Sequence, residues 1–175
     1  MSSGAPSIHL PVLSRQRQAD INASREQFAG ELAGLIEGEV RFDRHDRMLY
    51  ATDASIYQVE PIGVVCPRTI DDVVKVVRYC SERSLPMLPR GGGASLAGQT
   101  VNHAVVIDCS AYLREIGEVN AAERWVRVQP GVVLDQLNSV LATHSLMFGP
   151  DVASSSQANL GGMIGNNSAG AHSIL

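Results

Sequence analysis

The sequence is most constrained by one stretch, residues 90–99, which reads Arg-Gly-Gly-Gly-Ala-Ser-Leu-Ala-Gly-Gln. Three consecutive glycines can adopt positive φ, and their bare N–H groups can approach a ligand closely. Successive N–H groups in a concave turn bind an anion, to which Arg90 would add a charge and Ser95 a hydroxyl donor. A flexible surface turn is the alternative. The apolar flanks, residues 85–89 and 104–107, favour a phosphate-binding loop between two buried strands.

The amino-acid sequence of this loop excludes the two common nucleotide-binding motifs. A Walker loop ends in Gly-Lys-Ser or Gly-Lys-Thr, and residues 90–99 contain no lysine. A Rossmann fingerprint needs a third glycine where Leu96 stands, followed at once by a helix, whereas residues 98–102 are typical of a turn and a strand. We therefore expect a phosphate loop of another class.

Composition narrows the class of protein further. A chain of 175 residues with 45% hydrophobic and 18% charged residues is long enough for one domain with a real core. A net charge of −4 argues against nucleic acid as a partner. The sequence has no apolar run long enough to span a bilayer, and its N-terminal residues do not resemble a secretory signal. Cys66, Cys80 and Cys109 lack metal-binding spacing, so we expect buried free thiols, no metal site and a cytoplasmic protein.

The first fifty residues carry weaker signals. Residues 1–20 have no hydrophobic period and are predicted to be a mobile arm. Apolar residues at three-to-four spacing predict a helix over residues 24–36, with a capping box formed by Ser24 and Gln27. Residues 40–50 are polar and charged, which indicates a solvated loop.

The middle of the chain predicts a strand, a helix and a second strand. Residues 61–67 read as a buried strand, and residues 85–88 as the next. Between them, Thr69 would begin a helix whose buried face is predicted to contain Ile70, Val73, Val74, Val77 and Cys80. This βαβ unit would place the glycine loop at the carboxyl end of its second strand, where open α/β sheets bind ligands.

The remaining elements complete a mixed α/β (α+β) fold. We expect a third strand at residues 104–108, a hairpin of residues 115–119 with 124–129, and a helix over residues 133–141. The predicted architecture is thus the βαβ unit with a mixed sheet.

Residues 148–170 form a second unusual stretch, rich in hydrogen-bond donors and small residues and poor in charge. Small residues allow backbone to approach a flat ligand, and Asn, Ser and N–H groups can bind its polar rim. A serine-hydrolase elbow is rejected because Asn166 stands where its first glycine should be; an ordinary loop is the alternative. The sequence stops in an apolar run, residues 171–175, so we expect a longer natural polypeptide.

Together, these stretches resemble the FAD-binding domain of the vanillyl-alcohol oxidase and p-cresol methylhydroxylase (PCMH) type. The similarity is greatest to the branch of glycolate oxidase and D-lactate dehydrogenase-like flavoproteins. It is carried by residues 89–99, 129–132, 149–151 and 161–170, and residues 50–55 resemble a segment of long members fused to iron–sulfur modules. The resemblance covers residues 40–175, which separates an N-terminal arm and helix, residues 1–39, from an FAD-binding domain that is C-terminally incomplete.

The resemblance also implies a set of cofactor-binding residues. The glycine loop would bind the FAD pyrophosphate, and residues 150–170 would line the flavin ring and ribityl chain. The implied cofactor-binding residues are Arg90, Gly91, Gly92, Gly93, Ala94, Ser95, Gly98, Gln99, Pro150, Asp151, Asn159, Gly161, Gly162, Asn166, Ser168 and Gly170. Some relatives attach the flavin to a histidine in the glycine loop; this loop has none, so we expect non-covalent FAD.

By the same resemblance, the chain is part of an FAD-dependent oxidoreductase that acts on a small 2-hydroxy acid such as D-lactate, glycolate or 2-hydroxyglutarate. The resemblance leads us to expect the substrate-binding cap domain with its catalytic bases outside these 175 residues, so no catalytic residue is named, and His172 is a candidate for a flavin-edge contact only. The resemblance therefore implies a cap-domain or iron–sulfur partner. The alternatives are a non-catalytic nucleotide-binding fragment or accessory subunit, and a cell-wall precursor reductase that uses NADPH.

Overall fold

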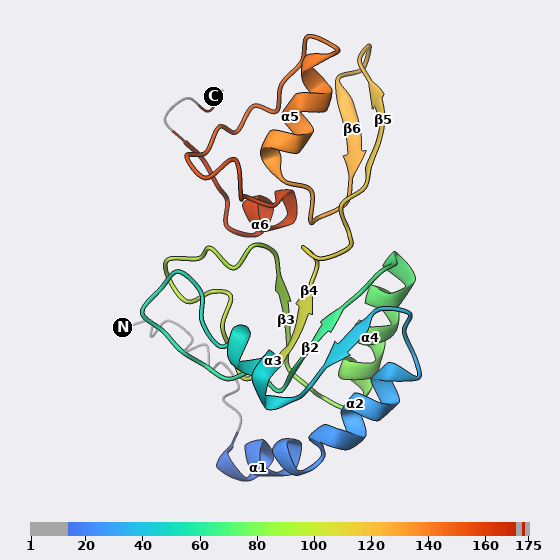
Figure 1. Ribbon diagram of the computed structural model, residues 1–175, viewed down its shortest axis with the longest axis vertical. Helices are drawn as coiled ribbons and strands as arrows, with labels where there is room; N and C mark the ends of the chain where they lie inside the picture. The colour runs from blue at the N-terminus through green and yellow to red at the C-terminus, as the bar shows by residue number, and fades with distance from the viewer. Residues whose placement is uncertain (1–13, 171–172, 174–175) are drawn as a thin grey trace, which may run out of the picture.

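The computed structural model describes residues 14–170 and Ser173, which form two lobes (Figure 1). The first lobe contains α1 (Arg15–Ala23), α2 (Arg25–Ala33), β1 (Glu39–Arg41), α3 (Arg44–Leu49), β2 (Gly63–Cys66), α4 (Ile70–Glu82), β3 (Met87–Arg90) and β4 (Val105–Asp108). The second contains β5 (Ile116–Asn120), β6 (Trp125–Val128), α5 (Leu134–Ala142) and α6 (Leu160–Gly165). The predicted mixed α/β fold is confirmed.

The first lobe is organised around a four-stranded sheet in the order β1-β2-β4-β3. Strands β2 and β3 run parallel to β4, whereas β1 is antiparallel to β2. The predicted βαβ unit therefore forms as β2-α4-β3, with β4 inserted between its two strands. Because three parallel strands end at one edge of the sheet, the glycine loop after β3 lies at the edge where open α/β sheets bind ligands.

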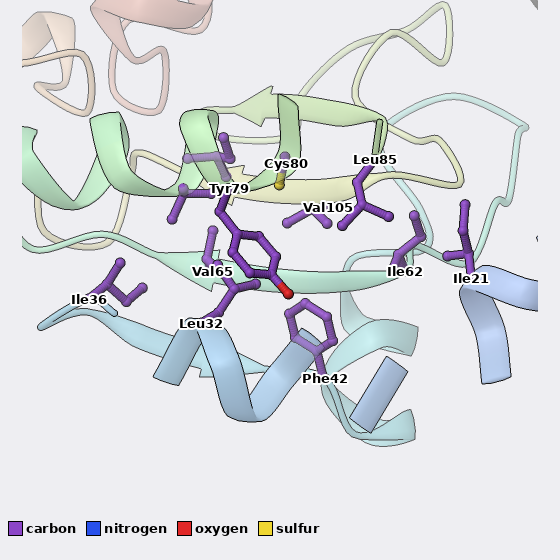
Figure 2. Close-up of a cluster of buried hydrophobic side chains, with 12 residues drawn as sticks. Ile21, Leu32, Ile36, Phe42, Ile62, Val65, Tyr79, Cys80, Leu85 and Val105 are labelled. Atoms are coloured by element: carbon purple, nitrogen blue, oxygen red, sulfur yellow. The ribbon is translucent and has the colours of Figure 1, made fainter. Parts of the chain in front are cut away.

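Helices α1, α2 and α4 contribute to the core on one face of this sheet (Figure 2). Ile21 of α1 and Leu32 of α2 pack in one buried cluster with Val65 of β2 and Val105 of β4. Tyr79 and Cys80 of α4 belong to the same cluster, and burial raises the pKa of the Cys80 thiol to about 11. Cys66 and Cys80 are buried free thiols as predicted, and Cys109 is a free thiol that is half-buried.

The buried face of α4 differs from the prediction. The structure exposes Ile70, Val74 and Val77 at 56%, 48% and 41%, and buries Asp72, Val76, Tyr79 and Cys80. Asp72 is fully buried because its carboxylate accepts hydrogen bonds from the backbone N–H groups of Glu37, Arg68 and Thr69. The helix is therefore oriented with the carboxylate of Asp72 toward the core. In this orientation Ile70, Val74 and Val77 lie at the surface.

The N-terminal segment is more ordered than predicted. Residues 1–13 lie outside the described residues, but residues 15–20 belong to α1 rather than to a mobile arm, because Ile21, 2% exposed, anchors that helix in the core. Helix α2 ends at Ala33 rather than at residue 36, and Ser24 makes no side-chain capping bond. The predicted capping box at Ser24 and Gln27 is thus wrong.

The prediction of a solvated loop over residues 40–50 is wrong. These residues contribute to strand β1 and helix α3. The strand pairs with β2, in the register of Val40 with Val65. Asp43 begins the helix, since its carboxylate accepts a hydrogen bond from Asp46 N–H at 3.0 Å. Only 8% of Arg47 is exposed, and its guanidinium pairs with Glu60. Pairing with β2 and burial of Arg47 place these charged residues in regular structure. Local composition does not predict such long-range contacts.

The hairpin and helix α5 of the second lobe follow the sequence prediction, whereas helix α6 lies within residues 148–170, for which no helix was predicted. Strands β5 and β6 form the expected antiparallel hairpin, and α5 occupies the expected helix positions. Leu134, Leu137 and Leu141 of α5 pack with Leu160 and Met163 of α6 in a separate buried cluster. No helix among the described residues is long and apolar enough to cross a membrane.

Candidate cofactor site

Strand β3 leads directly into the glycine loop. The strand covers Met87–Arg90, two residues later than predicted, so Gly91 is the first loop residue. The backbone N–H groups of residues 91–95 make no hydrogen bond to any other described residue. Of the three glycines, only Gly93 has positive φ, at 65°. Five successive unpaired N–H groups on one bend can bind an anion.

The guanidinium of Arg90 binds backbone oxygens. Its Nη1 donates to the carbonyls of Tyr50, at 3.1 Å, and Thr100, at 3.0 Å, and its Nη2 donates to the Thr52 carbonyl at 2.9 Å. A Cβ at Gly93 would collide with this guanidinium, so the side chain lies beneath the glycine bend. Arg90 therefore connects the loop to the segment that precedes β2.

That segment, residues 50–59, makes two further contacts near the loop. Tyr50 Oη donates to Asp108 Oδ2 at 2.6 Å, at the carboxyl end of β4, and burial together with this bond raises the pKa of Tyr50, which keeps it a donor. Asp53 Oδ2 accepts hydrogen bonds from Thr100 Oγ1 at 3.0 Å and Thr100 N–H at 3.4 Å. Both ends of the glycine loop are thus held from the same segment.

The hydroxyl of Ser95 shapes the loop from within. It donates to Gln99 Oε1 at 2.7 Å and accepts from the N–H groups of Ala97 and Gln99, each at 3.2 Å. Gly98 has φ of 74°, and a Cβ there would lie 2.6 Å from the ring of Tyr57. Among the residues predicted to bind the cofactor, Ser95, Gly98 and Gln99 therefore fix the loop conformation.

The second predicted stretch meets the loop at Asn159. A Cβ at Gly91 or at Gly92 would lie 3.2 Å from Asn159 Oδ1, so the two glycines make room for this side chain. Asn159 is 6% exposed, and its Nδ2 donates to the Gly131 carbonyl at 2.8 Å. Its Oδ1 is buried without a hydrogen-bond partner among the described residues. The structure thus brings Gly91, Gly92 and Asn159 together.

The other predicted residues of this stretch occupy different positions. Gly161 packs against Pro130, whose Cβ would be 2.6 Å from an added Cβ, whereas Gly162 faces open space. Gly170 lies against the carbonyl of Asp151, and the N–H groups of both residues donate to Ser173 Oγ. Pro150 is half-buried. Ser168 and Asn166, beyond α6, are joined at 3.4 Å near the surface. His172 lies outside the described residues.

Several residues that shape the site lie outside the set predicted from the sequence. Gly131 has no space for a side chain, because its Cα faces the carbonyls of Cys109 and Leu113 where the two lobes join. Tyr50, Thr52 and Thr100 hold Arg90 through their carbonyl oxygens. The Pro130-Gly131 turn is a sequence signal that could have identified Gly131. Contacts made by backbone carbonyl oxygens cannot be predicted from residue type, because every residue has one.

Comparison with solved structures supports the fold. The chain superposes on alkyldihydroxyacetonephosphate synthase with a TM-score of 0.74 at 20% identity, over 83% of this chain and 30% of that one. Aclacinomycin oxidoreductase gives a TM-score of 0.62 at 25% identity, over 76% of this chain and 27% of that one.

Comparison with curated sequences is more specific. The chain is 40% identical to the D-2-hydroxyglutarate dehydrogenase of Haemophilus influenzae over 141 residues, which are 79% of this chain and 14% of that protein. It is 30% identical to the glycolate oxidase subunit GlcD of Bacillus subtilis, over 77% of this chain and 30% of that protein. The chain therefore spans a small part of these relatives. Residues 61–175 match the FAD binding domain family, and the chain belongs to that family.

Proposed function

We propose that the chain binds FAD non-covalently, with the pyrophosphate on the N–H groups of residues 91–95. The observation that carries this proposal is the row of five unpaired N–H groups opposite the buried, unpaired Oδ1 of Asn159. The diphosphate of a dinucleotide requires hydrogen-bond donors, and the sugar hydroxyls that flank it require acceptors. Residues 90–99 contain no histidine or cysteine that could attach a flavin covalently.

The proposed site includes residues from both stretches. The glycine loop supplies backbone donors, while Arg90, Ser95, Gly98 and Gln99 hold it in shape. Gly162 faces open space and leaves room for a flat ligand. The remaining proposed contacts are Pro150, Asp151, Gly161, Asn166, Ser168 and Gly170. We also propose the division of the chain into residues 1–39 and an FAD-binding domain, residues 40–175, which the family match supports from residue 61 onward.

The activity we propose is the oxidation of a small 2-hydroxy acid. It is supported by the relatives' names, which are D-2-hydroxyglutarate dehydrogenase, glycolate oxidase and D-lactate dehydrogenase. A bound flavin would accept the hydride removed from the substrate carbon. The residues of this chain would orient the cofactor, and the catalytic base and substrate pocket would come from a cap domain or partner chain. An iron–sulfur partner is one candidate for that role.

FAD titration of the full chain tests the first part of the proposal. We expect quenching of flavin fluorescence and a shifted absorbance band near about 450 nm. Gly92→Val should weaken binding strongly, since its side chain would press on Asn159 Oδ1 and the Gln157 carbonyl, both 3.2 Å from the Cβ position. Leu96→Ala, at a side chain that is 82% exposed, is the control. A folded chain that does not bind FAD would refute the proposal.

The activity is tested by anaerobic mixing of the loaded protein with D-lactate, glycolate and D-2-hydroxyglutarate. Bleaching of the flavin band by one of them identifies the substrate. A non-catalytic or accessory role is the second candidate. Bleaching that requires a co-purified partner chain would favour that candidate.

A further inference from the structure

The side chain of Asn159 is oriented by a bond that leaves its oxygen facing the glycine loop. Nδ2 donates to the Gly131 carbonyl at 2.8 Å, and reversal of the amide would place two acceptor oxygens against each other. Oδ1 must therefore point toward Gly91 and Gly92. The orientation follows from the hydrogen-bond chemistry of the site.

The unpaired oxygen is costly in the free protein. Asn159 is 94% buried, since 6% of it is exposed, and Oδ1 has no partner among the described residues. Buried side-chain acceptors in folded proteins are nearly always paired, and a lone one indicates a missing donor. The N–H groups of Gly91 and Gly92, although these residues are adjacent, do not donate a hydrogen bond to it. The donor therefore comes from outside the described residues, and a ligand bound at the glycine loop would bring one to this position.

Within a dinucleotide, few groups can be that donor. Phosphate oxygens at neutral pH only accept hydrogen bonds, and the ring N–H groups lie at the two ends of FAD. The donors that flank the diphosphate are the hydroxyls of the ribityl chain and of the adenosine ribose. We infer that Asn159 Oδ1 accepts a hydrogen bond from one of these hydroxyls, an inference that rests on the proposed function.

This role makes Asn159 a specificity-determining residue for the cofactor. The glycine amides select a phosphate, whereas an acceptor beside them selects a hydroxyl and disfavours a second anion. A free diphosphate or other polyanion gains nothing from Oδ1 and is repelled by its lone pairs. Glycine is needed at 91 and 92 because any side chain there would push Oδ1 from its place.

The test measures the affinity of the full chain for FAD and for analogues that each lack one hydroxyl, by quenching of flavin fluorescence. We expect one analogue to bind about tenfold more weakly than FAD, because it leaves the buried oxygen unpaired. The analogue that loses affinity shows whether the hydroxyl belongs to the ribityl chain or the ribose.

The same affinity measurements on the Asn159→Ala variant test whether the lost affinity depends on this side chain. In this variant, FAD and that analogue should bind with equal affinity. If the variant does not fold, the analogue series on the unmodified chain still decides the matter. Tight FAD binding with equal affinities for every analogue would overturn the inference and leave the proposed function standing. Absence of FAD binding would overturn both.

Discussion

Replacement of Arg90 by lysine should destabilise the protein before any cofactor is added. The guanidinium serves three carbonyl oxygens through two nitrogens, at 2.9–3.1 Å. The ammonium nitrogen of lysine has three N–H donors but cannot occupy the positions of both guanidinium nitrogens, so at least one charged hydrogen bond is lost and the others lose the fixed geometry of the guanidinium. Each charged hydrogen bond contributes about 1.5–3 kcal/mol, and water can reach part of the exposed loop. We therefore expect a loss of about 3 kcal/mol in the free energy of unfolding.

Urea unfolding of the cofactor-free chain measures this loss, which corresponds to a midpoint lower by about 1–2 M. Arg78→Lys is the matched control, since Arg78 is exposed and makes no hydrogen bond or ion pair with another described residue. Affinity for FAD should fall along with stability, because the loop N–H groups lose their support. If Arg90→Lys leaves stability within about 0.5 kcal/mol of the parent yet abolishes FAD binding, Arg90 acts on the ligand directly and the reasoning fails.

Three further predictions concern adjacent glycines and two titratable groups. Gly161→Ala should destabilise by about 1–3 kcal/mol because its Cβ meets Pro130, whereas Gly162→Ala, with nothing within 4 Å, should be neutral or stabilising in thermal unfolding; equal effects would contradict the packing. Burial alone would raise the pKa of Asp72, but hydrogen bonds from the backbone N–H groups of Glu37, Arg68 and Thr69 outweigh burial, and the net pKa is lowered. The stabilisation from this carboxylate should therefore be present above pH 3.8 and be lost as the pH falls through the depressed pKa. Asp72→Asn should flatten this loss of stability at acid pH in urea titrations at several pH values. Burial and the charge of Arg25 lower the pKa of His103, so its neutral form stabilises the fold and stability should decline as pH drops below 6.5; a His103→Gln variant with the same decline would disprove this assignment.

The sequence by itself determined the local features of this protein. The amino-acid sequence of residues 90–99 distinguishes the loop from both Walker and Rossmann motifs. The structure confirms that a turn, and not a helix, follows the three glycines. The hairpin β5-β6 and helix α5 also agree with their local patterns. These features depend on residues near one another in the chain, where glycine freedom and hydrophobic period act directly.

Only the tertiary structure decided which surfaces meet. Helix α4 carries valines on more than one side, so its period alone did not reveal that Val76 faces the sheet while Val74 and Val77 face solvent. Likewise, the charge of Arg90 suggested a phosphate contact, but three distant carbonyl oxygens hold it. Asn159 meets Gly91 across more than sixty residues of chain. Such contacts depend on how strands stack and lobes join, which no local pattern encodes.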